Sequence, residues 1–313
     1  MKVWLTGGSG MVGRNVQERV ARQDGAAAGL VLLAPRHSEV DLLDASAIDA
    51  FLERERPDAV IHAAGTVGGI QANIASPVRF LQENILMGTN VVMGARRAGI
   101  TRLINLSSSC VYPRNGQNPL REDMILTGEL EPTNEGYAIA KIATARLCDY
   151  ISREDPSFLY KTLIPCNLYG RHDKFDPVHS HMIPAVIAKI AKAKDEGAQE
   201  VEIWGDGQSR REFMYAGDVA DFIVEALARI EALPAYMNVG LGYDYTINEY
   251  YQAVAHVLGY DGAFRHDLTK PTGMRQKLVS TETLKAFGWS APTSLEEGLR
   301  KTLDFYRNGQ SHD

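Results

Sequence analysis

The sequence predicts an α/β fold in which a parallel sheet carries helices on both faces. Three observations predict it. A short apolar run at residues 2–6 leads into a glycine-rich segment at 7–13 and then into a helical pattern. Strand-like and helix-like segments then alternate as far as residue 165, which is typical of parallel βαβ units. From about residue 166 the alternation breaks down, which predicts a smaller C-terminal lobe.

The first strand, the glycine-rich turn and the first helix form one unit. Residues 2–6 are β-prone, and residues 14–22 have a helical pattern. Gly7 permits the tight turn, Gly10 lets the backbone approach a pyrophosphate, and Gly13 lets the helix pack closely on the strand. Because the helix N-terminus then faces the phosphates, this order predicts dinucleotide binding in a Rossmann-type doubly wound sheet.

The remaining elements of the first half follow from apolar patterning and from chain breakers. The predicted strands are residues 30–34, 59–63, 102–106 and 160–165. The predicted helices are residues 45–55, 77–98 and 137–153. Pro57 ends the first of these helices, and Gly99 closes the second. Since ligands of such folds bind at the carboxyl ends of the strands, we expect the site at that edge of the sheet.

The C-terminal half predicts a smaller substrate lobe that is interleaved with the cofactor domain. Residues 169–181 form a loop rich in Gly, Pro, Asp and His. The predicted elements after it are helices at 184–194, 218–230 and 246–258 and a strand at 201–204. The helix at 218–230 returns to the main sheet. The predicted dinucleotide-binding domain is therefore 1–165 with 212–240, and the predicted substrate lobe is 166–211 with 241–313.

Composition and charge are those of an ordinary globular protein. The chain has 313 residues, of which 45% are hydrophobic and 23% are charged. A net charge of −6 argues against a nucleic-acid-binding surface. No apolar run approaches the roughly 20 residues needed to cross a bilayer, and no signal peptide is visible. Cys110, Cys148 and Cys166 form neither a disulfide framework nor a zinc pattern, so we expect no metal and a reducing cytoplasm.

Tyr137 and Lys141 predict the chemistry. Residues four apart on a helix place their side chains on one face. Lys141 would lower the pKa of Tyr137 by holding a positive charge beside the phenolate. A phenol tuned toward neutral pH exchanges a proton readily with a carbonyl oxygen. This proton exchange accompanies hydride transfer, so the pair predicts an oxidoreductase.

The chain resembles the extended short-chain dehydrogenase/reductases. Within them it is similar to the enzymes that epimerise and reduce a GDP-linked 4-keto-6-deoxyhexose. The resemblance covers nearly the whole chain and rests on the glycine segment, the Tyr–Lys pair and residues 63–70, 108–113, 130–135, 167–170, 179–181 and 211–213. It implies NADPH-dependent inversion of C3 and C5 followed by reduction of C4. It also implies a homodimer formed through the helices at 77–98 and 137–153.

The resemblance assigns roles to five residues. Ser108, Tyr137 and Lys141 correspond to the reductive triad, in which Tyr137 protonates the C4 oxygen and Ser108 hydrogen-bonds it. Lys141 also contacts the nicotinamide ribose. Cys110 and His181 correspond to the pair that inverts C3 and C5, with Cys110 as base and His181 as acid from the opposite face. A thiolate near a cation has a depressed pKa, which suits a base.

Cofactor and substrate contacts are implied in the same way. The cofactor positions are Gly7, Gly8, Ser9, Gly10, Met11, Val12, Gly13, Arg36, His37, Asp41, Leu42, Ala63, Ala64, Leu106, Ser107, Ser108, Lys141, Pro165, Cys166, Asn167, Leu168 and His181. The substrate positions are Lys189, Trp204, Arg211 and Thr272. NAD-specific proteins usually have an acidic residue after the second strand. Here Arg36 and His37 offer positive charge to a 2′-phosphate, so we expect NADPH.

Other functions remain open on the sequence. Lys189 stands where the family has Arg, and Thr272 stands where it has Asp. These departures favour a related GDP-sugar, such as a 6-deoxyheptose or colitose precursor, handled by an epimerase-reductase or a plain 4-reductase. A sugar-nucleotide dehydratase would need a carboxylate pair where this chain has Ser109 and Cys110. A dinucleotide-binding regulator without catalysis would lack the Tyr–Lys pair that is present here.

Overall fold

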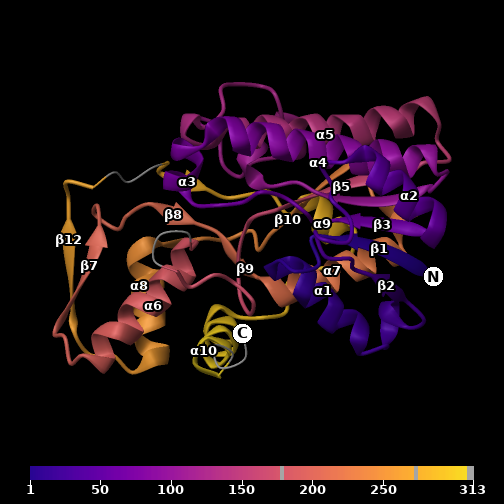
Figure 1. Ribbon diagram of the computed structural model, residues 1–313. Helices are drawn as coiled ribbons and strands as arrows, with labels where there is room; N and C mark the ends of the chain where they lie inside the picture. Colours follow the sequence, from indigo (N-terminus) through magenta and orange to yellow (C-terminus); the bar gives the residue numbers. More distant parts are fainter. Residues whose placement is uncertain (177–179, 271–273, 309–313) are drawn as a thin grey trace.

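A parallel sheet of six strands forms the centre of the molecule. The computed structural model describes residues 1–176, 180–270 and 274–308 (Figure 1). The strands are β1 (Lys2–Thr6), β2 (Val31–Leu33), β3 (Ala59–His62), β4 (Arg102–Leu106), β5 (Leu159–Pro165) and β10 (Tyr236–Val239). Their order is β10-β5-β4-β3-β1-β2, and every neighbouring pair is parallel. The chain therefore winds outward from β1 in both directions, which confirms the predicted doubly wound sheet.

Helices cover both faces of this sheet (Figure 1). They are α1 (Met11–Ala21) and α7 (Ala216–Ala228) on one face, and α2 (Ala45–Glu55), α4 (Pro77–Arg97) and α5 (Glu135–Glu154) on the other. Val3 and Leu5 of β1 contribute to the core that contains residues of α1 and α7. Trp4, between them, contributes to the core that contains residues of α2 and α4. This alternation is what a strand buried on both faces requires.

A smaller lobe has its own hydrophobic core. Its helices are α6 (Met182–Asp195), α8 (Ile247–Leu258) and α10 (Leu295–Asn308). Its paired strands are β6 (Asn167–Tyr169) with β9 (Phe213–Tyr215), β7 (Glu200–Trp204) with β12 (Ala263–Asp267), and β8 (Arg210–Arg211) between β11 (Tyr245–Thr246) and β13 (Gln276–Lys277). Ile187 of α6, Tyr250 of α8 and Leu299 of α10 meet in its core. Figure 1 shows β7 and β12 at the end of the molecule farthest from the N-terminus.

The two parts are connected through a buried carboxyl group. Glu212 lies between β8 and β9 and is 0% exposed. Its Oε1 accepts hydrogen bonds from the backbone N–H groups of Leu241 at 2.5 Å and Gly242 at 2.9 Å, just after β10. Its Oε2 accepts one from Val279 at 3.0 Å, just after β13. Burial raises the pKa of Glu212 to about 7, although the three N–H donors favour its charged form.

Most predicted elements lie within a few residues of the observed ones, and the differences have physical reasons. Helix α1 begins at Met11 rather than at residue 14, because Gly10 is its N-cap directly after the turn. The sequence pattern does not indicate β10, whose last three residues are buried without alternation. Three helices are not predicted either, namely the short α3 (Ile70–Ala75) and α9 (Glu282–Ala286) and the longer α10 (Leu295–Asn308). Leu284 of α9 packs in the core of the main sheet.

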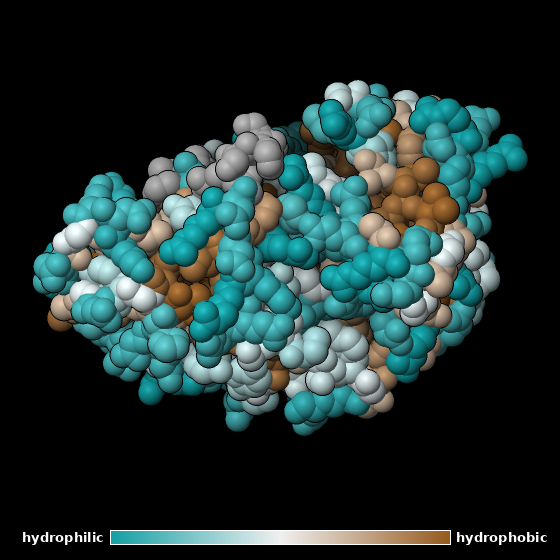
Figure 2. All heavy atoms as spheres, turned by 90° about the horizontal axis from the view of Figure 1, so that it is seen from below, coloured by the Kyte–Doolittle hydropathy of each residue, from teal (hydrophilic) through white to brown (hydrophobic). Residues whose placement is uncertain are grey.

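The surface shows no dominant apolar region on the face drawn in Figure 2, where hydrophobic areas are scattered among hydrophilic ones. Within the described ranges, no helix combines the length and hydropathy that crossing a membrane requires. Among the same residues, no group of three or more His, Cys, Asp and Glu side chains is arranged to hold a metal ion.

Candidate active site

Residues that follow four neighbouring strands meet at one edge of the sheet, as expected. After β3, the backbone N–H of Ala64 donates to Oγ1 of Thr6, at the end of β1, at 3.2 Å. After β4, the N–H of Ser107 donates to the carbonyl oxygen of Leu163 on β5 at 2.8 Å. After β5, the N–H of Cys166 donates to the carbonyl oxygen of Val239 on β10 at 3.0 Å. These bonds fix the loops that carry the predicted cofactor residues.

Tyr137 and Lys141 lie on the same side of helix α5. The Nζ of Lys141 lies 5.7 Å from the centre of the Tyr137 ring and donates to the carbonyl oxygen of Leu106 at 3.0 Å. Burial lowers the pKa of Lys141 to about 8. The pKa of Tyr137 is raised rather than lowered, because burial of the phenol, with the nearby Cys110 thiolate, disfavours the phenolate. The expectation of a depressed phenol pKa is therefore wrong, and Tyr137 is a protonated donor at neutral pH.

Ser108 and Cys110 occupy the turn that follows β4. The residues 109–111 form a 3₁₀ helix, and Oγ of Ser108 accepts from the backbone N–H of Cys110 at 3.5 Å. Cys110 is buried, and burial raises its thiol pKa. The positive charge of Lys277, the Ser108 hydroxyl and the positive charge of Lys141 act in the opposite direction but do not outweigh burial. The expectation of a depressed thiol pKa is therefore also wrong.

Lys277 is a cation of this site that the sequence patterns do not indicate. It lies on β13, opposite Arg211 of β8 in the pairing of the two strands. Its charge interacts with Cys110, Arg211 and Glu131, and burial lowers its pKa. No local motif surrounds Lys277, so only the strand pairing reveals that a residue so distant in sequence faces Cys110.

His181 lies at the start of the smaller lobe. It directly precedes α6, its side chain is 43% exposed, and its Nδ1 lies 3.7 Å from a carboxylate oxygen of Asp173. Among the residues that the structure describes, no hydrogen bond or ion pair joins His181 to Cys110. A Cβ on Gly69, in the loop after β3, would lie 3.7 Å from the carbonyl oxygen of Ser180, so this segment does approach the loop beside the site. His179 lies outside the described residues.

The glycine turn after β1 is shaped for a dinucleotide. Gly7 has a φ of +71°, and a Cβ on it would lie 2.7 Å from the backbone nitrogen of Ala64. A Cβ on Gly13 would lie 2.2 Å from the carbonyl oxygen of Gly7, so α1 starts in direct contact with the turn. Gly10 caps α1 without any side-chain hydrogen bond. Ser107, across the sheet edge, has a buried Oγ without a partner. Both the turn and this hydroxyl therefore suit a dinucleotide with phosphate and ribose groups.

Gly13 and Gly10 differ in a way that can be measured. Gly13→Ala should lower the free energy of unfolding by about 1–3 kcal/mol, because its Cβ has no room inside the protein. Gly10→Ala should cost less, about 0.5–1 kcal/mol, because its Cβ meets nothing closer than 3.4 Å and only the preference for glycine at the N-cap of α1 is lost. Both should weaken dinucleotide binding. Urea unfolding and cofactor titration measure the two effects, and equal stability losses would contradict the packing role of Gly13.

The segment after β2 carries the residues expected at the adenosine end of the cofactor. Arg36 and His37 are exposed, and Nδ1 of His37 lies 3.6 Å from a carboxylate oxygen of Asp41. The side-chain amide of Asn90 donates to the carbonyl oxygen of Leu42 at 3.0 Å, which holds this segment against α4. The exposed side chains of Arg36 and His37 are therefore accessible to a 2′-phosphate.

The expected substrate residues are spread over the smaller lobe. Lys189 on α6 donates to the carbonyl oxygen of Glu202 at 2.6 Å, and burial lowers its pKa. Trp204 is 53% exposed at the end of β7, and Nζ of Lys270 lies 5.5 Å from its ring centre. Arg211 donates to the carbonyl oxygen of Arg210 at 2.7 Å, and burial lowers its pKa. Thr272 lies outside the described residues.

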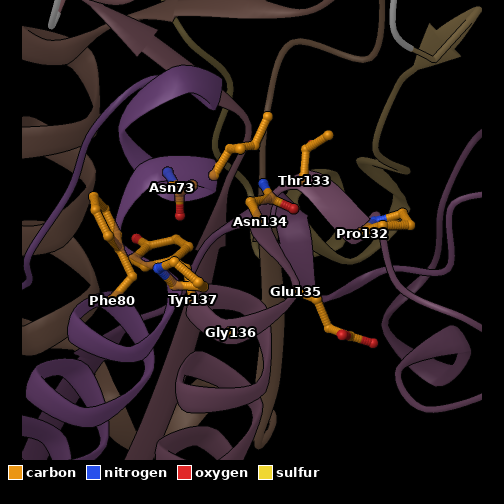
Figure 3. A pocket seen from close by; sticks show the side chains of 10 residues that line it. Asn73, Phe80, Pro132, Thr133, Asn134, Glu135, Gly136 and Tyr137 are labelled. Atoms are coloured by element: carbon orange, nitrogen blue, oxygen red, sulfur yellow. The ribbon is translucent and has the colours of Figure 1, made fainter.

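A pocket of about 220 Å³ lies beside Tyr137 (Figure 3). Its walls come from α3, the first turns of α4, the 3₁₀ turn at 132–134 and the first residues of α5. Asn73, Phe80 and Asn134 line it together with Tyr137. The cavity therefore lies directly beside the Tyr137 side chain.

Comparisons with known proteins show the family of the chain and its fold. A family model described as the NAD dependent epimerase/dehydratase family matches residues 3–240. A GDP-L-colitose synthase from Yersinia pseudotuberculosis is 52% identical over 313 residues, which cover 100% of both chains. A GDP-L-fucose synthase from Azorhizobium caulinodans is 50% identical over 308 residues, which cover 98% of this chain and 97% of that protein. The structure of a GDP-L-fucose synthetase from Naegleria fowleri bound to NADP has a TM-score of 0.90 at 25% identity, covering 99% of this chain and 94% of that one.

Proposed function

The chain belongs to the NAD dependent epimerase/dehydratase family, and we propose that it converts GDP-4-keto-6-deoxymannose to GDP-L-fucose with NADPH. It is an NADP-dependent oxidoreductase with epimerase activity, and the similarity to GDP-L-fucose synthases inferred from its sequence is confirmed. One observation carries the proposal. The Tyr137–Lys141 pair and Cys110 are gathered, with Ser108, beside the loops that hold the dinucleotide.

In the reductive step, this chain supplies the proton and the charge. When bound, NADPH supplies the hydride that reaches C4. Tyr137 then donates its proton to the C4 oxygen, and its raised pKa keeps it protonated until that oxygen becomes basic. Lys141 provides positive charge beside the phenol, and the Ser108 hydroxyl hydrogen-bonds the same oxygen. Lys141 would also hold the nicotinamide ribose of a bound NADPH.

In the epimerisation, Cys110 removes the protons at C3 and C5. The 4-keto group acidifies both C–H bonds, because the resulting carbanion is delocalised onto its oxygen. Burial raises the pKa of the Cys110 thiol, and the positive charges of Lys277 and Lys141 oppose that rise by stabilising the thiolate that forms when a base is needed. His181 returns a proton from the opposite face and acts from the loop before α6.

We assign the rest of the site to two parts of the chain. Residues 1–165 with 212–240 hold NADPH, with Arg36 and His37 at its 2′-phosphate. Residues 166–211 with 241–313 hold the GDP-sugar. In the second part Arg211 and Lys189 neutralise the pyrophosphate, and the exposed ring of Trp204 stacks on guanine or packs on ribose.

We also propose a homodimer formed through α4 and α5. Val78, Leu86 and Ile139 on these helices are 72%, 37% and 41% exposed, which leaves apolar surface for a second copy. Ile142, in contrast, is buried within the monomer. The three free cysteines are buried, which suits a cytoplasmic protein.

A second candidate is the same chemistry on a related GDP-sugar. The 52% identity to a GDP-L-colitose synthase favours the precursor of colitose, a 3,6-dideoxy sugar. Lys189 is a further reason, since it cannot bind phosphate through two parallel hydrogen bonds as an Arg does. The remaining alternative is an enzyme that only reduces C4 of a 6-deoxyheptose derivative.

A reaction in deuterated water tests the proposal. The protein is given GDP-4-keto-6-deoxymannose and NADPH, and NMR locates deuterium in the product. We expect deuterium at both C3 and C5, oxidation of NADPH and the fucose configuration. Oxidation of NADPH without deuterium incorporation would limit the activity to reduction at C4. Suppose instead that only the 3-deoxy counterpart of this sugar, the colitose precursor, is turned over, with deuterium exchange at C5. That result would establish the second candidate.

A further inference from the structure

We propose that Asp173 is a positioning residue, which holds the imidazole of His181 through Nδ1 and leaves Nε2 to return a proton to the sugar ring. The inference rests on the proposed function, because that function makes His181 the acid of the epimerisation. It adds a residue to that step beside Cys110 and His181. Nδ1 of His181 lies 3.7 Å from Oδ1 of Asp173, and among the described residues neither side chain forms another ion pair.

The carboxylate of Asp173 is buried and poorly paired. Its side chain is 5% exposed. Its Oδ1 accepts a hydrogen bond from the backbone N–H of Lys174 at 2.8 Å, and its Oδ2 is buried without a partner in the part of the chain that the structure describes. A carboxylate shielded from water is costly unless it is paired with a cation or fully hydrogen-bonded. The imidazolium form of His181 is the cation within reach, and the buried Asp173 acts on it rather than on the sugar.

Helices α1 and α10 fix the backbone that carries Asp173. The two preceding residues, Arg171 and His172, both pair with the carboxylate of Glu18 on α1, and Nε2 of His172 lies 2.5 Å from its Oε1. The His172 ring also packs on Phe305 of α10, with 4.7 Å between the ring centres. His172 has a φ of +65°, which a residue other than glycine keeps only when its surroundings enforce it. Asp173 therefore starts from a rigid support.

The backbone of His181 is fixed as well, whereas its side chain can turn. His181 is the N-cap of α6, and its carbonyl oxygen accepts from the N–H of Ala185 at 3.1 Å. Its side chain is 43% exposed and makes no capping hydrogen bond. A separation of 3.7 Å is longer than a hydrogen bond, but the bonds of catalytic groups are often long before substrate binds and shorten when it does. A small rotation of the imidazole brings Nδ1–H to the carboxylate of Asp173.

Holding one ring nitrogen of His181 determines what the other can do. A carboxylate bonded to Nδ1–H fixes both the direction of an imidazole and the nitrogen that acts on the substrate. In the imidazolium form, Nε2–H gives its proton to the enolate of the sugar. The N–H bond breaks, a C–H bond forms from the electron pair of the enolate, and the ring becomes neutral while Asp173 stays charged. The exposed ring then recovers a proton from water.

Asp173→Asn tests this role, because it removes the negative charge and keeps the size of the side chain. GDP-4-keto-6-deoxymannose is supplied in deuterated water with NADP⁺ in place of NADPH, so that C4 is not reduced. NMR then follows inversion and deuterium entry at C3 and C5. We expect the rate of inversion to fall about tenfold to a hundredfold, which is part of the 10²- to 10⁴-fold that a positioned acid contributes. The KM for the sugar should stay the same, since Asp173 does not contact it.

A double-mutant cycle separates positioning from support of the fold. If Asp173 acts through His181, adding Asp173→Asn to His181→Asn should change the residual rate by less than about twofold. The matched control is Asp195→Asn at the exposed C-terminal end of α6, which should leave the rate unchanged. Asp173→Ser, which also removes the charge, is a second variant and should show the same loss as Asp173→Asn. Unchanged NADPH affinity and urea unfolding show that the variants are folded.

The outcomes distinguish this inference from the proposed function. If the wild-type protein inverts the sugar and the Asp173 variants do so at the same rate, the inference alone is overturned. Equal losses with and without His181 also overturn it, because Asp173 would then act on the fold and not through the imidazole. A wild-type protein that inverts neither C3 nor C5 overturns the inference together with the epimerase part of the proposed function.

Discussion

Replacing Tyr137 with Phe is expected to lower the rate of NADPH oxidation by about 10²- to 10⁴-fold. The change removes only the hydroxyl group that protonates the C4 oxygen. The ring remains in place beside Lys141, whose Nζ lies 5.7 Å from its centre. Binding of NADPH should therefore change little. Stopped-flow measurement of NADPH oxidation with saturating GDP-4-keto-6-deoxymannose gives the rate, and fluorescence titration gives the cofactor affinity.

The matched control is Tyr150→Phe on the same helix. Tyr150 is 53% exposed and lies outside the site, so its hydroxyl should not affect the rate. The Tyr137→Phe variant should also still exchange protons at C3 and C5, because that step depends on Cys110. Full retention of NADPH oxidation in Tyr137→Phe would remove Tyr137 from the role of proton donor.

Replacing Cys110 with Ser is expected to reduce deuterium exchange at C3 and C5 by about 10²- to 10⁴-fold, because a hydroxyl is a far weaker acid than a thiol and forms almost no anion. NMR of the recovered sugar in deuterated water measures the exchange. Cys148→Ser is the matched control, since Cys148 is buried in a different hydrophobic core, the one that contains residues of α2 and α4. Unchanged exchange in Cys110→Ser would exclude the thiol as the base.

The rates of epimerisation and of reduction should also respond to pH in opposite directions. The raised pKa of Cys110 means that the thiolate fraction, and with it the exchange rate, increases as pH rises. Lys141 is charged below its pKa of about 8, so reduction should be full below that pH and should decline above it. Both rates are measured from about pH 6 to about pH 9. Parallel pH profiles would contradict the separate assignments.

The fold could be predicted from sequence where local signals are strong. The glycine turn carries such a signal, and so do the helices that end before Pro57 and Gly99. These signals make strands and helices alternate, which predicts that the first five strands run parallel. Strand β10 could not be predicted, because its four residues are selected by burial between β5 and α9 and carry no periodicity of their own. In the smaller lobe β7 is predicted at 201–204, whereas β6, β8, β9, β11 and β13 have only two or three residues, and long-range pairing makes them strands.

The site could be predicted as far as its motifs extend. The Tyr–Lys spacing places Tyr137 and Lys141 together, and the sheet edge brings Ser108 and Cys110 to them. The direction of the pKa shifts could not be predicted, because burial is a property of the packed protein and outweighs the neighbouring charges. The positions of Lys277 and Asn73 could not be predicted for a related reason. Each is brought to the site by tertiary contacts and carries no motif.

The three hydrogen bonds to Glu212 limit how the protein can admit and release its substrate. Swinging the smaller lobe away from the sheet would strip this side chain of the N–H groups of Leu241, Gly242 and Val279 while it is still shielded from water. Charge-assisted bonds of this kind contribute about 1.5–3 kcal/mol each, so a clamshell motion about this joint is costly. We therefore expect the joint at Glu212 to stay closed while the substrate enters and the product leaves.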